Sequence, residues 1–202
     1  MELIIKKVYT KNMKYLIKKI DEFNANELRD FINKIPLVKL KRISKMNGIS
    51  FRQSVVGEIL LSKLLEEEHI DYTKIIVRYN ENGKPYISNY QMFYNIAHDN
   101  NYVICAINNN GPIGVDILRM NNININIAKS FCSKEELSYI KNKFQFYHVF
   151  TLKEAYLKLF GKKINDIKEL NIIQDNKIKL NVINKSFIID SNYIVSICYD
   201  IY

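Results

Sequence analysis

The sequence from Asn101 to Ile107, NYVICAI, returns in altered form from Asn192 to Cys198 as NYIVSIC. Both stretches begin with Asn-Tyr and continue with β-branched and other apolar residues, a composition typical of a buried β-strand. In each half of the chain a long helix pattern precedes several short strand patterns, and one of these two stretches comes last. The repetition predicts a tandem duplication of an α+β unit.

We therefore expect an α+β fold of two similar half-domains, one over residues 1–110 and one over residues 111–202, related by a pseudo-twofold axis. Each half-domain should pack a helix on a small antiparallel sheet. Two such units must bury a shared face, so the seam between them is the expected place for a ligand site.

Helical periodicity is strongest in two segments. Residues 51–67 place apolar side chains on one stripe and charged side chains, including Glu58, on the other side. Residues 146–161 carry the second helix pattern, which ends at a glycine, and residues 11–33 carry a mixed helical pattern. Strands are expected at residues 2–9, 75–79, 85–87, 93–96, 102–107, 113–118, 170–173, 177–182, 186–189 and 193–199.

Composition and charge limit the classes of function. The 202 residues are 48% hydrophobic and 25% charged, which excludes a disordered or low-complexity chain. Thirty Lys and Arg against 21 Asp and Glu give a formal net charge of +9, which favours a polyanionic ligand or an acidic partner. The N-terminus does not resemble a signal peptide, and no apolar stretch approaches the ~20 residues that span a bilayer, so we expect a cytoplasmic protein. The three widely spaced cysteines indicate neither a disulfide framework nor a zinc site.

A single carboxylate interrupts the apolar run Gly114-Val115-Asp116-Ile117-Leu118. The two-residue period of a strand places Gly114, Asp116 and Leu118 on one face and the two β-branched residues on the other. An ionised Asp116 in such a run is costly unless it is paired, capping or bound to a metal. From these residues alone, Asp116 could have a catalytic or metal-binding role, or it could cap a neighbouring element or form a salt bridge.

In the second helix pattern, Thr151, Glu154 and Lys158 share one stripe. Glu154 and Lys158 could form an ordinary solvent-facing pair at i, i+4, or they could join Asp116 in a site of two carboxylates and an ammonium. Such a site suits Mg²⁺-assisted chemistry on a phosphoanhydride, because hard oxygen ligands hold the ion and a lysine stabilises charge on the leaving group.

Five short motifs occur in a fixed order: Gly83-Lys84-Pro85, Phe93-x-Asn95-Ile96-Ala97-His98, Gly114-Val115-Asp116, Phe131-x-Ser133-x-Glu135-Glu136 and Lys153-Glu154-Ala155-x-x-Lys158-x-x-Gly161. In this order and spacing they resemble the Sfp-type 4′-phosphopantetheinyl transferases, across residues 50–200. The resemblance implies that family's fold, a two-lobed monomer that is a pseudo-dimer with its active site between the lobes.

The resemblance also implies an activity. Enzymes of this family transfer the 4′-phosphopantetheine group of coenzyme A to a serine hydroxyl of an apo acyl or peptidyl carrier protein, and adenosine 3′,5′-bisphosphate leaves. The reaction depends on Mg²⁺, for which Mn²⁺ can substitute, and it serves fatty-acid or secondary-metabolite biosynthesis. The implied partner is thus a carrier protein, and neither nucleic acid nor a membrane is expected.

The motifs imply roles for individual residues. Asp116 and Glu154 match the family's metal carboxylates, and Glu154 also matches the base for the serine, acting directly or through a water. Lys158 matches the lysine on the phosphates.

Further residues are implied as contacts of coenzyme A. Lys84, after the turn glycine, and His98 match such contacts in the motifs, although a turn lysine and a lone histidine also occur with purely local roles. Outside the motifs, Arg52 or Lys41 is expected to reach the adenosine phosphate.

The chain departs from the family pattern at three positions near these residues. Leu118 stands where the family commonly has a second acidic residue after the aspartate, so one metal ligand is missing. Mg²⁺ often keeps several waters and uses one or two carboxylates, and we therefore expect an active enzyme with a water in that position. Ala97 and Asp99 flank His98 where small hydroxyl residues are usual.

Residues 131–147 combine lysines with aromatic side chains. They fit an amphipathic helix with a solvated loop, or a docking surface for acidic carrier proteins. The residues of this expected surface are Lys134, Lys141, Lys143, Phe144 and Phe146.

Two other classes of function stay open on sequence grounds. A homologue that binds coenzyme A or a carrier without catalysis would follow if Leu118 abolishes activity. A basic module that binds nucleic acid or another polyanion would agree with the +9 charge and the 14 tyrosines, but no nucleic-acid-binding motif supports it.

Overall fold

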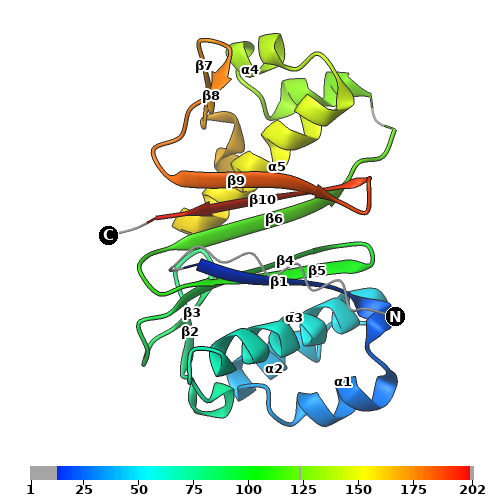
Figure 1. The fold of residues 1–202 in the computed structure, drawn as a ribbon, viewed down its shortest axis with the longest axis vertical. Helices are drawn as coiled ribbons and strands as arrows, with labels where there is room; N and C mark the ends of the chain where they lie inside the picture. Colours follow the sequence, from blue (N-terminus) through cyan, green and yellow to red (C-terminus); the bar gives the residue numbers. More distant parts are fainter. Residues whose placement is uncertain (1–12, 123, 201–202) are drawn as a thin grey trace.

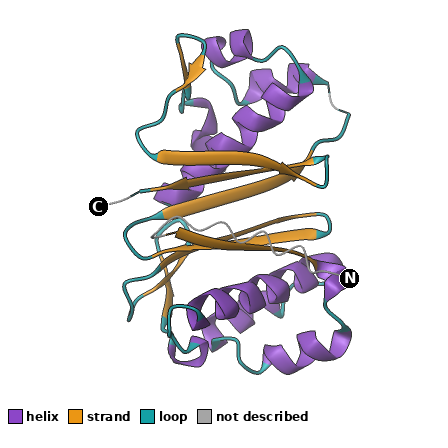
Figure 2. Cartoon of the chain, viewed as in Figure 1, coloured by secondary structure: helices purple, strands orange, loops and turns teal. Residues whose placement is uncertain are grey.

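The computed structural model describes residues 13–122 and 124–200 and contains two three-stranded antiparallel sheets that face each other in the middle of the molecule (Figure 1). Helices cover the outer side of each sheet, as Figure 2 shows. The helices are α1 (Ala25–Ile32), α2 (Leu37–Ile43), α3 (Gly48–Glu66), α4 (Lys134–Tyr139) and α5 (Lys143–Phe160). The strands are β1 (Met13–Lys19), β2 (Val77–Tyr79), β3 (Pro85–Ile87), β4 (Phe93–Asp99), β5 (Tyr102–Asn108), β6 (Ile113–Arg119), β7 (Ile173–Gln174), β8 (Lys177–Ile178), β9 (Ile183–Ile189) and β10 (Tyr193–Tyr199).

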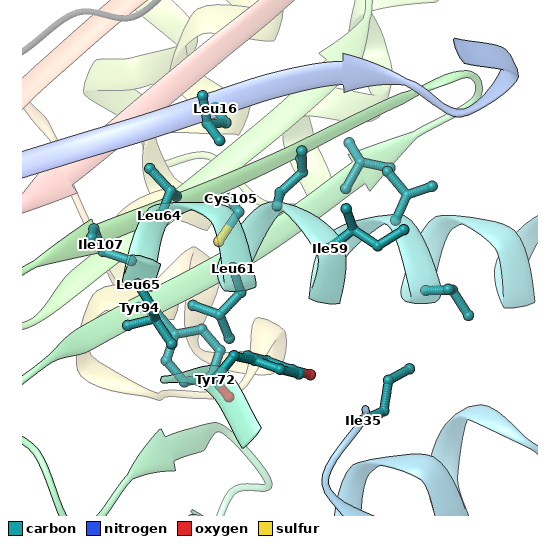
Figure 3. Packing of buried hydrophobic residues seen from close by; sticks show 14 of the residues in the cluster. Leu16, Ile35, Ile59, Leu61, Leu64, Leu65, Tyr72, Tyr94, Cys105 and Ile107 are labelled. Carbon is teal, nitrogen blue, oxygen red and sulfur yellow. The ribbon is translucent and has the colours of Figure 1, made fainter. Parts of the chain in front are cut away.

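The first sheet has the order β1-β5-β4, and α3 packs on its outer face. Its central strand, β5, is the NYVICAI stretch, buried on both faces as its apolar composition requires. Leu64 and Leu65 of α3 lie beside Cys105 and Ile107 of β5 in one apolar cluster (Figure 3). The burial of these large side chains, about 1.5–3 kcal/mol each, holds the helix on the sheet.

The second sheet has the order β6-β10-β9, and α5 covers its outer face. The NYIVSIC stretch forms the central strand, β10, which is buried along its whole length. Gly114 of β6 explains how closely the helix approaches, because a Cβ at this position would lie 2.0 Å from the Ala155 carbonyl oxygen and 2.4 Å from the Leu159 nitrogen. Any side chain at residue 114 would push α5 away from the sheet.

Between the two sheets lies a separate apolar cluster. Val115 and Ile117 of β6 belong to it, together with Ile104 of β5 and Val195 of β10. Leu118 instead packs against the cluster beneath α5, on the other side of the second sheet. The two-residue period read from the sequence is therefore confirmed, and Asp116 faces the helix rather than the first sheet.

The α+β class and the small antiparallel sheets are confirmed, and the helix patterns over 51–67 and 146–161 correspond to α3 and α5. The mixed helical pattern at 11–33 is wrong in its first part, because Met13–Lys19 is strand β1 and pairs with β5; among the described residues of this stretch, a short 3-10 helix at Ile20–Glu22 and α1 are helical. The strand expected at residues 2–9 lies outside the described residues. Within residues 13–122 and 124–200, no helix has the length and apolar character needed to cross a bilayer.

Glu58 corrects a second expectation. It was placed on the polar side of the helix, yet its side chain is buried on α3. The Tyr72 hydroxyl donates a 2.7 Å hydrogen bond to its carboxylate, and Lys39 of α2 forms an ion pair with it. Residues from two other segments cover this side of α3, so the helix is buried on more than its apolar stripe.

Candidate active site

The edge strands of the two sheets, β4 and β6, run next to each other without forming a common ladder. Side chains of β4 contact the backbone of β6 instead. The Val115 N–H donates a 2.8 Å hydrogen bond to Asn95 Oδ1, and the Arg119 N–H donates a 2.7 Å hydrogen bond to Asp99 Oδ2. This seam carries the sequence-predicted residues His98, on β4, and Asp116, on β6.

Asp116 is buried between β6 and α5, with 7% of its surface exposed. The Lys158 ammonium donates a 2.6 Å hydrogen bond to Asp116 Oδ1. Burial raises the pKa of the Asp116 carboxyl, and the Lys158 charge opposes that rise. The pair accounts for how a carboxylate is accommodated in the apolar run of β6.

Glu154 lies one helical turn before Lys158 on α5 and is also buried. Its Oε1 atom is buried and has no hydrogen-bond partner among the described residues. Burial raises the pKa of the Glu154 carboxyl, and the negative charge of Asp116 raises it further. The two carboxyl groups are therefore close enough to interact electrostatically, and one of the four oxygens is available to a ligand.

The close approach at Gly114 brings these groups together. Gly114 stands two residues before Asp116 on the same face of β6, and the α5 backbone at Ala155 and Leu159 fills the space that a side chain would take. Since Glu154 and Lys158 each precede one of these contact residues, the same contact sets both side chains opposite Asp116.

Lys84 lies at the end of the β2–β3 turn and connects this turn to the second half of the molecule. Its ammonium donates 3.0 Å hydrogen bonds to the carbonyl oxygens of Ile113, at the start of β6, and Leu159, in the last turn of α5. Burial lowers the pKa of the Lys84 ammonium to about 8. A cation at a helix C-terminus also interacts favourably with the helix dipole.

His98 lies within β4, one residue before its end, and its side chain keeps solvent access. Desolvation and the positive charge of Lys158 lower the pKa of the His98 imidazole, while the charges of Asp99 and Asp116 act in the opposite direction. His98 thus belongs to the same electrostatic group as Asp116 and Lys158.

Within the described residues, the two other predicted coenzyme A residues form no hydrogen bond or ion pair with Asp116, Glu154 or Lys158. Arg52, on α3, donates hydrogen bonds of 3.3 and 3.2 Å to the carbonyl oxygens of Ile20 and Phe23. It lines a surface hollow with residues of α1, and neither Asp116 nor Glu154 lines that hollow. Lys41 is exposed on α2.

The expected docking surface is only partly at the surface. Lys134 and Lys141 are exposed and Phe144 is 44% exposed, but Phe146 is buried at 3% exposure and belongs to the core beneath α5. Phe146 was therefore wrongly placed on that surface, because it starts the inward-facing stripe of α5.

A buried ion pair that the sequence did not reveal fixes the segment before α5. The Lys153 ammonium, on α5, donates hydrogen bonds to Glu136, on α4, at 2.6 Å and to the Phe131 carbonyl oxygen at 2.7 Å. Both Lys153 and Glu136 are fully buried. Lys153 directly precedes Glu154, and consecutive residues of a helix lie about 100° apart, so the two side chains point in different directions.

These residues fit a divalent cation, because the buried Glu154 Oε1 has no hydrogen-bond partner among the described residues and lies near a second carboxylate. Two carboxylates with waters suit Mg²⁺. The described residues contain no group of three or more His, Cys, Asp or Glu that could hold a metal.

Comparisons with known proteins give the same family as the motifs. Residues 112–198 match the family model of the 4′-phosphopantetheinyl transferase superfamily. The chain is 37% identical over 117 residues to the 4′-phosphopantetheinyl transferase gsp of Aneurinibacillus migulanus, covering 54% of this chain and 48% of that protein, so this match spans about half of the relative's length. It is 29% identical to the 4′-phosphopantetheinyl transferase Sfp of Bacillus subtilis (strain 168), over 72% of this chain and 73% of that protein.

A third relative extends the similarity over almost the whole chain. The 4′-phosphopantetheinyl transferase ffp of Bacillus subtilis is 25% identical over 203 aligned positions, which cover 91% of this chain and 89% of the relative. The family model covers β6, α5 and β10, the elements that carry Asp116, Glu154 and Lys158. Residues 112–198, which carry all three of these side chains, are thus similar to the 4′-phosphopantetheinyl transferase superfamily.

Proposed function

We propose that the protein transfers the 4′-phosphopantetheine group of coenzyme A to a serine hydroxyl of an apo acyl or peptidyl carrier protein. The observation that carries the proposal is the buried group of Asp116, Glu154 and Lys158, in which one carboxylate oxygen has no partner among the described residues. The named activity of the relatives supports the same reaction. We also retain the division into half-domains at residues 110 and 111, with the active site at the seam.

In the proposed reaction the serine oxygen attacks the phosphorus that carries the pantetheine arm. A new phosphorus–oxygen bond forms, the bond to the bridging pyrophosphate oxygen breaks, and adenosine 3′,5′-bisphosphate leaves with the electron pair. Glu154 takes the serine proton, directly or through a water. Burial and the Asp116 charge raise the pKa of Glu154, and this makes the carboxylate a better proton acceptor than an exposed one.

Asp116 and Glu154 would hold a divalent cation, Mg²⁺ or Mn²⁺, between them. When bound, such an ion neutralises charge on pyrophosphate oxygens and lowers the repulsion that a diphosphate would meet from two carboxylates. Lys158 lies against Asp116 and supplies a positive charge for the oxygens on which negative charge develops.

Other residues are proposed to bind rather than to react. His98 is proposed to meet a phosphate, and the influence of the Lys158 charge on its pKa supports this proposal. The Lys84 ammonium donates hydrogen bonds to two carbonyl oxygens in the free protein, and we propose that it contacts coenzyme A from this position. Arg52 and Lys41 stay proposals for the adenosine phosphate. We further propose a cytoplasmic monomer whose partner is an acidic carrier that docks near Lys134, Lys141 and Phe144, with no contact to nucleic acid or membrane.

The test is incubation of the purified protein with an apo carrier, coenzyme A and Mg²⁺, followed by mass spectrometry. A mass gain of one phosphopantetheine on the carrier supports the proposal, and omission of the metal should remove the gain. Apo carriers from fatty-acid, polyketide and peptide synthesis are tested side by side, since the cognate one is not fixed by the structure. Absence of a gain on every carrier would contradict the proposal and favour a homologue that binds coenzyme A without catalysis.

A further inference from the structure

Two side chains of β4 replace the strand neighbour that β6 lacks on one edge. The opposite edge of β6 pairs with β10, so the residues of β6 that point their N–H groups away from β10 are Ile113, Val115, Ile117 and Arg119. At an ordinary sheet edge these groups would meet water, and inside a protein an unpaired N–H is costly. Asn95 and Asp99 accept hydrogen bonds from two of these four groups, at 2.8 and 2.7 Å.

The spacing of these two contacts shows a register. Residues 95 and 115 differ by 20 positions, and so do residues 99 and 119, so β4 and β6 run parallel with side chains in place of a backbone ladder. The position between the two acceptors is Ala97, which has no polar side-chain atom and is buried in the cluster between the sheets with Ile117. The Ile117 N–H therefore has no acceptor from a β4 side chain.

Asp116 lies between Val115 and Arg119, the two residues of this edge whose N–H groups are held by β4 side chains. A shift of β6 relative to β4 would move the Asp116 carboxylate away from Glu154 and Lys158.

We propose that Asn95 and Asp99 are positioning residues, which hold the free edge of β6 through Val115 and Arg119 and thereby fix the Asp116 carboxylate opposite Glu154 and Lys158. The inference rests on the proposed function for its kinetic readout. It predicts that the oxygen acceptor at residue 99 matters and that its negative charge does not, because the contact is a hydrogen bond to a backbone amide.

The experiment compares Asp99→Ala with Asp99→Asn, which keeps an acceptor oxygen and removes the charge. Tyr102→Phe is the matched control, because the Tyr102 hydroxyl donates a 2.8 Å hydrogen bond to Asp190 rather than bonding to the β6 backbone. Asn95→Ala repeats the test at Val115 and serves if Asp99→Ala fails to fold.

Three measurements are made on each variant. Amide hydrogen exchange at Val115 and Arg119 and Mn²⁺ affinity without coenzyme A do not depend on turnover. The third is kcat and KM for coenzyme A. We expect Asp99→Ala to speed exchange at Arg119 and to weaken Mn²⁺ binding and kcat by about 10-fold, the usual effect of losing a group that orients a ligand, with KM within about twofold. Asp99→Asn and Tyr102→Phe should resemble the wild type.

The proposal is overturned if Asp99→Asn is as defective as Asp99→Ala, since charge would then be the cause. It is also overturned if Tyr102→Phe weakens Mn²⁺ binding equally, or if Asp99→Ala and Asn95→Ala leave amide exchange and Mn²⁺ affinity unchanged. A protein without transferase activity on any carrier would refute the proposed function, yet its exchange rates and Mn²⁺ affinities would still decide the role of Asn95 and Asp99.

Discussion

Each of the two long helices, α3 and α5, covers one sheet and buries a glutamate, but the two glutamates differ in their partners. Glu58 of α3 accepts a hydrogen bond from Tyr72 and pairs with Lys39. Glu154 of α5 keeps a buried oxygen without a partner among the described residues, beside a second carboxylate. A buried carboxylate with its hydrogen-bonding sites filled stabilises the fold, whereas one left open is available for a ligand.

Energetics explain why the difference is informative. Desolvating a carboxylate costs several kcal/mol unless partners restore the lost hydration. Lys39 and Tyr72 replace the lost hydration of the Glu58 carboxylate, and they come from two different segments that cover α3. At Glu154 the protein tolerates an incompletely satisfied group. We therefore expect opposite results from replacing each glutamate by glutamine, in activity at Glu154 and in stability at Glu58, and experiment can test this contrast.

The largest effect is expected for Glu154→Gln. The change removes the proposed proton acceptor and one charge of the metal site, and we expect transfer activity to fall by about 1,000-fold. The midpoint of thermal unfolding should stay the same or rise, because a neutral amide replaces a partly unsatisfied buried carboxylate. Tyr156→Phe, on the same helix but with its hydroxyl on Asn181 at an exposed site, is the control. A near-native rate in Glu154→Gln would remove Glu154 from the mechanism.

Glu58→Gln should do the reverse. The substitution leaves the Lys39 ammonium buried without its carboxylate, and breaking one side of a buried ion pair costs about 3 kcal/mol of unfolding free energy. Activity per folded molecule should not change. Glu66→Gln, exposed on the same helix, should shift stability by less than about 0.5 kcal/mol. Urea titrations monitored by circular dichroism measure both changes, and equal stability of the two variants would contradict the comparison.

Local sequence patterns predicted which faces of β6 and α5 carry the residues of the candidate site. The two-residue period of β6 placed Asp116 on one face with Gly114 and Leu118, and the helical spacing of α5 placed Glu154 and Lys158 on one stripe. In the structure Lys158 lies 2.6 Å from Asp116. A strand or helix pattern is set by neighbours in the sequence, so these faces can be read without knowing the fold.

The features that sequence reasoning missed depend on distant segments. Glu58 is buried because Lys39 and Tyr72 cover it, and β1 is a strand because β5 pairs with it, although the four-residue spacing of Lys14 and Lys18 in MKYLIKK also suits a helix. Asn95 and Asp99 have a role only because β6 lies next to β4. Tertiary contacts override local preference at each of these positions.

Leu118→Glu sharpens the comparison by adding a carboxylate on the face of Asp116. Leu118 is half-buried at the cluster beneath α5, so the change should cost about 1 kcal/mol of stability. If the missing ligand limits metal binding, the Mg²⁺ concentration for half-maximal rate should fall by about 10-fold. Leu118→Gln, which carries no charge, should leave that concentration unchanged. An unchanged requirement in Leu118→Glu would show that two carboxylates with water suffice.

The smallest expected effect is on the pH dependence of stability, and it too separates the two helices. The pKa of Glu154 is raised above its ordinary value of 4.5, chiefly by burial. Between the ordinary and the raised pKa, the folded protein therefore binds more protons at this site than the unfolded chain, and stability falls as the pH rises through that window.

Without divalent metal, the unfolding free energy of the wild type should fall relative to that of Glu154→Gln as the pH increases from acid to neutral, and the difference should be constant above the raised pKa. Asp116, whose pKa is also raised, is present in both proteins and contributes equally to a first approximation. Saturating Mg²⁺ should reverse the trend in the wild type, because the ion binds the ionised carboxylates. A wild-type curve parallel to that of Glu154→Gln would mean that the Glu154 carboxyl is solvated or partnered in solution, and the contrast with Glu58 would then fail.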